Sequence, residues 1–221
     1  MSETRISPSV SSDPLAGSRV ALTPRGALYA FSQAEPDATQ ARLQTILSAE
    51  ALPTVNAWVR RSPAHPKLLG EGLAAGWLQR VHRSFPAPDV KLDSFLSHII
   101  GGLSGEQKAA LAAAGGFCVG QVGYADDEAE TLCAAAADFS EFARRQRTRG
   151  WRGASYMTSF HEDIAMLMPT TSFVPFWIDR TDYCLILGGE PLINNPALVE
   201  LIWGIKAAGA RFSNKFTHEL G

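Results

Sequence analysis

The chain has 221 residues, of which 46% are hydrophobic and 19% are charged. This composition excludes disorder of the whole chain, and the length is sufficient to bury a core without disulfide bonds. The net charge of −2 at pH 7 argues against bulk electrostatic binding to nucleic acid or to a membrane surface. We therefore expect neither of them as a partner.

The beginning of the chain and the distribution of cysteines point to a compartment. Residues 1–17 are rich in Ser and Pro and lack an apolar segment, which predicts a disordered arm rather than a signal peptide. The most apolar stretch, 109–122, is interrupted by glycines and is too short to span a bilayer. Cys118, Cys133 and Cys184 each lie in an apolar context without a CxxC spacing, which predicts free, buried thiols. We expect a cytoplasmic protein.

Residues 18–86 predict an N-terminal subdomain that mixes helices and strands. The predicted elements are a hairpin over 19–31, a helix over 36–47 and a strand over 55–59. The segment 68–85 is ambiguous, since its glycines argue against a helix in the first half while apolar spacing favours one in the second half. Pro86-Ala87-Pro88 marks the expected domain boundary.

Residues 89–209 predict a second domain, followed by a tail over 210–221. Ser104-Gly105-Glu106-Gln107 fits a capping box that opens a helix through Ala114. Asn195 and Pro196 predict the start of the last helix, and Gly209 predicts its end. The other predicted elements are a helix over 92–100, strands over 117–119 and 121–124, a helix over 127–146, and strands over 154–160, 164–168 and 183–187, with 173–178 as a further candidate.

This order, with a glycine-bounded hairpin before an alanine-rich helix that starts Asp-Asp-Glu, resembles the roadblock/dynein light chain family. The resemblance rests on element order over 89–209. It implies a layered α/β (α+β) fold of the roadblock/profilin type, in which an antiparallel sheet is flanked by helices, with the other face or an edge free. The long segment 169–182 departs from the compact family pattern. Whether the N-terminal half is a degenerate second copy stays open.

The resemblance implies a non-catalytic, regulatory interaction module that forms a homodimer and docks a partner protein such as a small Ras-like GTPase. An alternative of a different class is a small enzyme or a ligand-sensing domain with a pocket between its two halves. Both functions stay open, because the resemblance rests on element order and not on a signature motif.

Motifs for catalysis and for cofactors are weak. His161-Glu162-Asp163 could serve a Cys-His-Asp hydrolase with Cys118 as the nucleophile, but a polar tripeptide is also typical of a hairpin tip, and no nucleophile elbow is present. The five histidines lack metal-ligand spacing, and the glycine-rich stretches match no nucleotide-binding loop. We therefore expect no catalytic residue, no cofactor and no metal.

Three groups of residues are candidates for a partner surface. The alanines of the 127–146 helix offer a smooth face for close helix contact, or simply favour helicity. The arginines after residue 143 could contact an acidic partner, or complement the negative end of the helix dipole. The apolar run 173–177 is either core or a docking patch. The candidate residues are Ala134, Ala135, Arg144, Arg145, Arg147, Phe173, Phe176 and Trp177.

Overall fold

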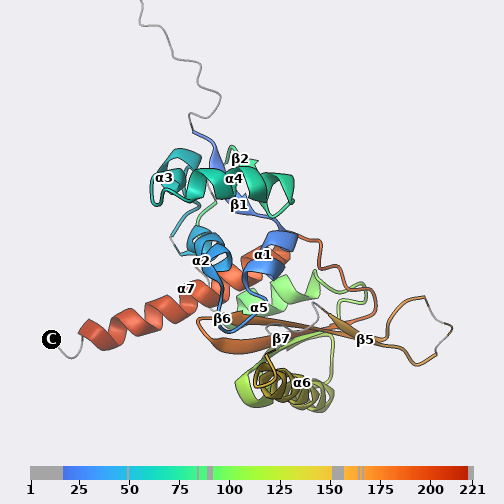
Figure 1. The fold of residues 1–221 in the computed structure, drawn as a ribbon. Helices are drawn as coiled ribbons and strands as arrows, with labels where there is room; N and C mark the ends of the chain where they lie inside the picture. The colour runs from blue at the N-terminus through green and yellow to red at the C-terminus, as the bar shows by residue number, and fades with distance from the viewer. Residues whose placement is uncertain are drawn as a thin grey trace, which may run out of the picture.

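The computed structural model describes residues 17–48, 50–83, 85–88, 92–150, 157–163, 165 and 167–218. Its centre is an antiparallel five-stranded sheet with the strand order β4-β3-β7-β6-β5. The strands are β3 (Ala109–Ala113), β4 (Phe117–Val122), β5 (Thr158–Phe160), β6 (Thr171–Ile178) and β7 (Thr181–Gly188). Helices flank this sheet, so the expected fold class is confirmed (Figure 1).

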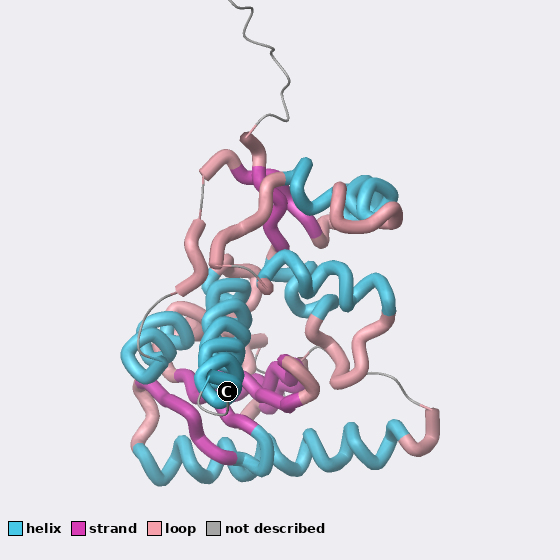
Figure 2. The backbone as a smooth tube through the Cα atoms, turned by 90° about the vertical axis from the view of Figure 1, so that its left-hand side faces the viewer, coloured by secondary structure: helices cyan, strands magenta, loops and turns pink. Residues whose placement is uncertain are grey.

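Helices cover both faces of the sheet. Helix α6 (Asp126–Arg147) packs on one face, and α5 (Leu92–Gly101) and α7 (Ala197–His218) pack on the other (Figures 1 and 2). Side chains of each strand alternate between two cores: Ala109 and Leu111 enter the larger core, whereas Ala110 and Ala112 enter the smaller core under α6. Of the two surfaces expected to be free, the other face of the sheet or an edge, the face is covered, and among the described residues an edge is left.

The central strand β3 replaces the helix predicted over 104–114. Ser104 does not cap a helix: its hydroxyl accepts from the backbone N–H groups of Glu106 and Lys108 at 3.2 and 3.0 Å and donates to the Gly188 carbonyl at 2.7 Å. The alanine run then pairs with β4 on one side and β7 on the other. Pairing on both sides outweighs the helix propensity of alanine, and the small side chains let α6 approach closely.

The hairpins differ from their predicted limits. A short 3₁₀ turn, η2 (Ala114–Gly116), joins β3 to β4, which is one strand rather than the predicted pair. Leu111 faces Gly120 and Ala112 faces Cys118, so a bulge lies between these pairs. A two-residue turn joins β6 to β7.

At that turn Asp179 and Arg180 adopt φ values of 49° and 71°, as a two-residue turn of type I′ requires. The further candidate strand, 173–178, is confirmed as part of β6. The strand predicted over 164–168 is wrong, since the described residues there form bends and turns. Of the strand predicted over 154–160, residues 154–156 lie outside the described residues, and β5 forms its end.

The long helices follow their capping signals at the start. Helices α5 and α6 are confirmed, and the first turn of α6 carries three acidic residues at the positive end of its dipole. The Asn195 side chain accepts from the Ala197 N–H at 3.0 Å at the start of α7. Helix α7 continues to His218, so the predicted end at Gly209 is wrong and the helix enters the expected tail.

The N-terminal half is mainly helical. Its elements are β1 (Arg19–Leu22), α1 (Pro24–Ala30), α2 (Ala38–Gln44), η1 (Thr45–Leu47), α3 (Val55–Val59), α4 (His65–Ala74) and β2 (Leu78–Val81), with β1 paired to β2. The helix predicted over 36–47 is confirmed as α2 and η1. The second arm of the hairpin predicted over 19–31 and the strand predicted over 55–59 are wrong, because both form helices. The ambiguous segment 68–85 contains the end of α4 and the strand β2. Because this half does not follow a hairpin, helix, strand order, the basis for a second copy is lost.

Local capping explains both missed helices. Thr23 accepts from the Gly26 N–H at 3.0 Å with Pro24 in the first turn of α1, and Thr54 accepts from the Ala57 N–H at 3.2 Å in α3. Gly26 is required because a Cβ there would overlap the Trp77 carbonyl oxygen. Alternation over five residues is too short a signal to distinguish a strand from such a capped turn.

The larger core joins the two halves of the chain. It contains Phe31 and Trp58 from the N-terminal half together with Phe176 and Leu201. The Trp177 N–H also donates to the Phe31 carbonyl at 2.9 Å. The two segments 18–86 and 89–209 therefore share one core. Their division into two domains at 86–88 stays a proposal.

Candidate functional site

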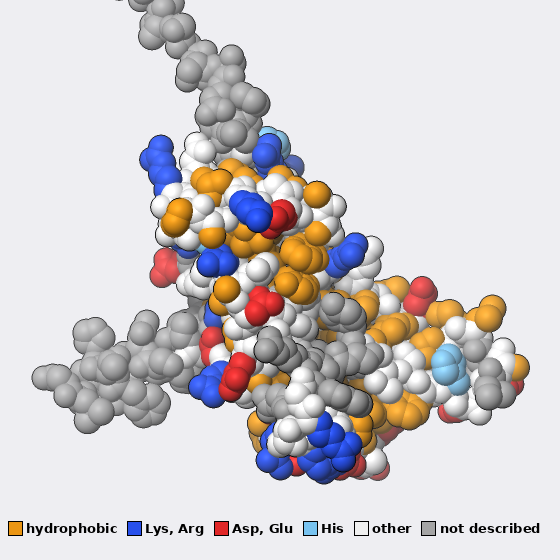
Figure 3. Space-filling model, in the orientation of Figure 1, with side chains coloured by type: hydrophobic (Ala, Val, Ile, Leu, Met, Phe, Trp, Pro, Cys, Tyr) orange, Lys and Arg blue, Asp and Glu red, His pale blue; other side chains and the backbone are white. Residues whose placement is uncertain are grey.

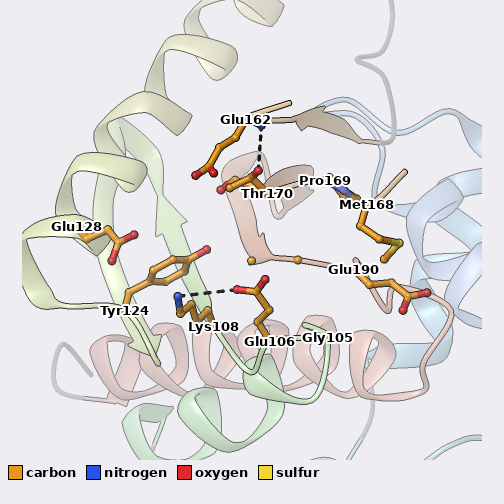
Figure 4. Close-up of a pocket in the computed structure, with 13 residues that line it drawn as sticks. Gly105, Glu106, Lys108, Tyr124, Glu128, Glu162, Met168, Pro169, Thr170 and Glu190 are labelled. Atoms are coloured by element: carbon orange, nitrogen blue, oxygen red, sulfur yellow. Dashed lines mark hydrogen bonds and ion pairs between the residues drawn. The ribbon is translucent and has the colours of Figure 1, made fainter. Parts of the chain in front are cut away.

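An acidic pocket of about 520 Å³ opens on the surface of the described chain. It lies where β3 begins and β7 ends, and the loop before β6 and the first turn of α6 complete its wall (Figure 4). Its charged lining consists of Glu106, Glu128, Glu162, Glu190 and Lys108. Four carboxylates therefore face one ammonium group, which gives the pocket a strongly negative potential.

Few of these charges are neutralised by a close partner. Lys108 Nζ lies 3.8 Å from a carboxylate oxygen of Glu106. Within the described part of the chain, the carboxylates of Glu128, Glu162 and Glu190 form no ion pair. The pocket therefore offers hydrogen-bond acceptors without matching donors.

Tyr124 forms the deep part of the pocket wall. Its side chain is only 8% exposed, and its buried hydroxyl lies beside Thr171, whose side chain interacts with it. The hydroxyl points into the space beside Glu106 and Glu128 (Figure 4). Burial, with added repulsion from Glu128, raises the pKa of Tyr124 to about 12 against the opposing effect of Thr171. The phenol is thus neutral at physiological pH.

Two glycines form the floor of the pocket. A Cβ on Gly188 would lie 2.9 Å from the Lys108 Cβ and 3.0 Å from the Tyr124 hydroxyl. Gly189 has a φ of +65°, and a Cβ there would lie 2.7 Å from Glu106 Cγ. The Gly188 N–H donates to the Lys108 carbonyl at 2.8 Å, and the Gly189 N–H donates to the Thr170 carbonyl at 3.0 Å. These bonds hold the floor at one position.

A second hollow, of about 490 Å³, lies between the two halves of the chain. This is where the alternative function, a small enzyme or a ligand-sensing domain, would place its pocket. Ala34 and Glu35 line it together with Arg144, Thr148 and Arg180. Both arginines are already paired, Arg180 with Glu35 at 3.3 Å and Arg144 with a neighbouring glutamate on α6. Because these pairs are exposed to solvent, each contributes little stability.

That neighbouring glutamate is Glu141, whose carboxylate lies 2.7 Å from Arg144. The hydrogen bond from Arg144 holds the pKa of Glu141 below its ordinary value. Arg145 is exposed on the same helix, and basic side chains gather over α6 (Figure 3). Arg147 ends α6, and its side chain lies outside the described residues.

The apolar run 173–177 does not form a surface patch. Phe173 and Phe176 are 4% and 0% exposed, and they enter the smaller and the larger core respectively. Successive strand residues point to opposite faces, so residues three apart in β6 separate in this way. Trp177 is partly buried. A partner that docks on the folded chain cannot contact Phe173 or Phe176, because both side chains are buried in the two cores.

The edge strand β4 is a feature that the sequence did not reveal. It pairs with β3 alone among the described strands, and its residues Phe-Cys-Val-Gly-Gln-Val include neither a charge nor a proline. Phe117, its first residue, is 70% exposed. The opposite edge strand, β5, has only three residues. The sequence predicted two short strands over 117–119 and 121–124, so it did not place one six-residue strand at the edge of the sheet.

The alanine face of α6 is continuous with this edge. Ala134 is exposed, and a Cβ on Gly116, the residue before β4, would lie 3.0 Å from the Ala134 Cα and 3.2 Å from the Ala137 Cβ. Ala135, in contrast, packs in part on the smaller core. Of the two predicted alanines, only Ala134 is therefore fully available to a partner.

The three thiols meet in the smaller core. Ala112 of β3 faces Cys118 on β4 and Cys184 on β7, and Cys133 approaches from α6. Burial raises the pKa of Cys184 to about 12, and burial with the adjacent Cys118 raises the pKa of Cys133 to about 12. His161 Nδ1 instead lies 3.1 Å from the Met168 carbonyl in the loop after β5. The structure therefore does not join His161 and Cys118 into a nucleophilic pair.

The described residues contain neither a cluster of metal ligands nor a helix that could span a membrane. No group of three or more His, Cys, Asp or Glu side chains in this part of the chain is placed to hold a metal ion. None of the described helices combines the length and the apolar character needed to cross a membrane.

Neither a protein-family model nor a curated protein matches this sequence. Two solved structures are similar to it. A roadblock/LC7 domain from Streptomyces avermitilis is 15% identical, with a TM-score of 0.37 over 57% of this chain and 99% of that chain. Myxococcus xanthus MglB is 11% identical, with a TM-score of 0.34 over 61% of this chain and 96% of that chain. The expected resemblance to roadblock domains is confirmed as a likeness in fold.

Proposed function

We propose that this chain is a non-catalytic interaction module of the cytoplasm. It pairs with a second copy of itself along β4 and the adjoining alanine face of α6. In the paired state it docks a partner protein such as a small Ras-like GTPase. The three free thiols support a reducing compartment.

The observation that carries this proposal is the uncharged edge of β4. An unpaired strand edge offers a row of backbone donors and acceptors, and monomeric proteins protect such edges with charges, prolines or short strands. The edge strand β5 is short, whereas β4 has six residues and no charge or proline. The bulge opposite Leu111 and Ala112 is its sole protection of this kind among the described residues. Cover by a second copy satisfies this edge.

The surroundings of the edge favour a symmetric pair. A two-fold axis places the same patch of both copies in contact, and an edge strand can pair with itself in antiparallel register. Phe117 supplies exposed apolar area at one end of β4. Ala134 on α6 adds a small side chain that lets two helices approach with little loss of side-chain entropy.

The partner surface is proposed at the basic end of α6. Arg144 and Arg145 are exposed near the C-terminal end of α6, where the helix dipole is negative. A small Ras-like GTPase is the partner that the roadblock resemblance implies. The overall charge of −2 favours a local electrostatic contact over broad attraction to an anionic surface.

Size-exclusion chromatography of charged variants tests the pairing. Phe117→Lys and Ala134→Glu place charge on the two parts of the proposed interface, and both should shift the protein toward the monomer because a buried unpaired charge opposes association. Phe160→Lys is the matched control, since Phe160 is 50% exposed on the opposite edge strand. It should leave the elution unchanged. Unchanged elution of both test variants, with a folded circular dichroism spectrum, contradicts the proposed interface.

A binding assay tests the partner separately. A small Ras-like GTPase from the same organism, loaded with GDP or with a non-hydrolysable GTP analogue, is titrated with the wild type and with Arg145→Glu. We expect binding in at least one nucleotide state and a weaker affinity for the variant. Equal affinity of both proteins removes the basic end of α6 from the docking surface, and no binding in either state contradicts the GTPase partner.

A further inference from the structure

The three cysteines of the chain share one layer, between the sheet and α6. Ala112 of β3 faces Cys118 on β4 and Cys184 on β7, and residues directly opposite each other point to the same face of a sheet. Cys133 enters this layer from α6, and the smaller core contains all three side chains. The proposed docking of a partner makes no use of these thiols.

Cys118 and Cys184 cannot form a disulfide with each other. They lie on the two neighbours of β3, so their Cα atoms are about two strand spacings apart, and one spacing is about 4.7–4.9 Å. A disulfide requires Cα atoms within about 7 Å of each other. Any disulfide within this layer must therefore include Cys133.

The direct neighbour of the Cys133 thiol is Cys118. A hydrogen bond joins the side chains of Cys118 and Cys133, whereas Cys184 acts on Cys133 only through its charge. The backbones are also close at this level, because a Cβ on Gly116, just before β4, would lie 2.8 Å from the Cys133 carbonyl oxygen. Close backbones and adjacent thiols are what a disulfide between α6 and β4 needs.

The two thiols differ in access. Cys133 is 0% exposed, and burial is the main cause that raises its pKa to about 12. Cys118 is only partly buried, and it lies on β4, which among the described strands pairs with β3 alone. A small oxidant therefore reaches Cys118 first. A partly exposed cysteine beside a second cysteine is the usual arrangement of a redox-sensitive site.

We propose that Cys118 and Cys133 are a peroxide-sensitive site that closes reversibly into a disulfide. The Cys118 sulfur attacks one oxygen of hydrogen peroxide and becomes a sulfenic acid, and the other oxygen leaves as water. The Cys133 sulfur then attacks the Cys118 sulfur, and the displaced hydroxyl group leaves as water with the Cys133 proton. Two thiols are oxidised, and one peroxide is reduced to two molecules of water.

The bond would join the edge strand to the helix that covers it. A cross-link between β4 and α6 restricts the unfolded chain and raises the melting temperature. Cellular thiols reverse it by exchange, and transient disulfides in reducing compartments are typical of redox sensing. The Cys118 side chain packs on the core under α6 and does not form part of the backbone edge. The site therefore stands or falls independently of the proposed pairing along β4.

Peptide mapping of the peroxide-treated full chain tests the site. The reduced protein is freed of reductant, treated with hydrogen peroxide at neutral pH and alkylated in denaturant. Mass spectrometry of a digest made without reductant should show a peptide that joins Cys118 to Cys133 and disappears after treatment with dithiothreitol. Mapping is preferable to the intact mass, because Met168 is 44% exposed and also takes up oxygen.

Three variants make the test specific. Cys118→Ala and Cys133→Ala should each abolish the linked peptide, and Cys133→Ala should leave a sulfenic acid on Cys118 that dimedone traps. Cys184→Ala is the matched control, because Cys184 faces the same alanine from the other side, and it should form the linked peptide like the wild type. Peroxide should raise the melting temperature of the wild type and of Cys184→Ala, but not that of Cys118→Ala.

Three outcomes overturn the proposal. The first is the absence of a peptide linking Cys118 to Cys133 from the oxidised wild type. The second is a peptide that joins Cys133 to Cys184, which would place the reactive pair inside the sheet. The third is a covalent dimer linked through Cys118 on a gel run without reductant, which would show that this thiol faces a second copy instead of α6.

Discussion

Gly188 packs so closely on Tyr124 that a Cβ at this position would lie 3.0 Å from the phenol oxygen. We predict that Gly188→Ala lowers the free energy of unfolding by about 1–3 kcal/mol, because Tyr124 and Lys108 must both move. The loss should be smaller in a Tyr124→Phe background, since the oxygen is absent there. Urea unfolding of the four proteins in this cycle measures the coupling.

Gly70→Ala is the control for that cycle, because a Cβ at Gly70 in α4 meets nothing within 4 Å. It should stabilise the chain by up to about 1 kcal/mol. If Gly188→Ala lowers the free energy of unfolding equally with and without the Tyr124 hydroxyl, the hydroxyl does not contact a side chain at position 188.

Substitutions of Phe176 and Phe117 should differ greatly in their effect on the free energy of unfolding. Phe176 is fully buried in the core that joins the two halves, and it stacks on Tyr183 with ring centroids 5.6 Å apart. Phe176→Ala should lower the free energy of unfolding by about 3–5 kcal/mol. Phe117→Ala, at a residue 70% exposed, should change it by less than about 0.5 kcal/mol in the monomer. Similar effects of the two variants in urea unfolding would contradict the burial of Phe176.

Local signals in the sequence predicted the long helices, while pairing over long distance decided the rest of the fold. The acidic start of α6, the Asn195 cap of α7 and the Asp179-Arg180 turn act within a few residues of themselves. The alanines of β3 favour a helix locally, and only their position between β4 and β7 makes them a strand. No window of sequence contains that information.

The candidate site shows the same division. Ala134 and Arg144 could be placed on one helix by their spacing, and the structure places them on α6. The acidic pocket could not be predicted, because Glu106, Tyr124 and Glu190 come from segments that meet only when β3 pairs with both β4 and β7. Phe173 and Phe176 were candidates for a surface because the alternation within β6 does not tell which layers cover its two faces.

The thiols should differ in reactivity. Cys133 and Cys184 are 0% and 3% exposed, and Cys118 is only partly buried. With a disulfide reagent near neutral pH, we predict that Cys133 and Cys184 react slowly in the native protein and fast in denaturant, because burial opposes both access and ionisation. Counting the released chromophore over time measures this. A rapid reaction of Cys133 or Cys184 in the native state would contradict their burial and would revive a nucleophilic role.

Stability should fall at alkaline pH. The pKa values of Cys133 and Cys184 rise from 9.0 in the free thiol to about 12 in the folded chain. The unfolded state therefore releases these protons first, so their contribution is complete below pH 9 and is lost as the pH rises toward 12. Urea unfolding at neutral and at alkaline pH should show this fall, and a Cys133→Ala/Cys184→Ala variant should show a shallower one. An identical fall in both proteins would assign the effect to other groups.

The mass of the wild-type protein in solution tests the central claim most directly. The monomer has a mass of 23.8 kDa, and pairing along β4 and α6 predicts a species of twice that mass. Light scattering after size exclusion, over a series of loading concentrations, distinguishes the two. We predict a mass of twice 23.8 kDa that declines toward the monomer on dilution. A mass of 23.8 kDa at every concentration would contradict the proposed pairing of the β4 edge.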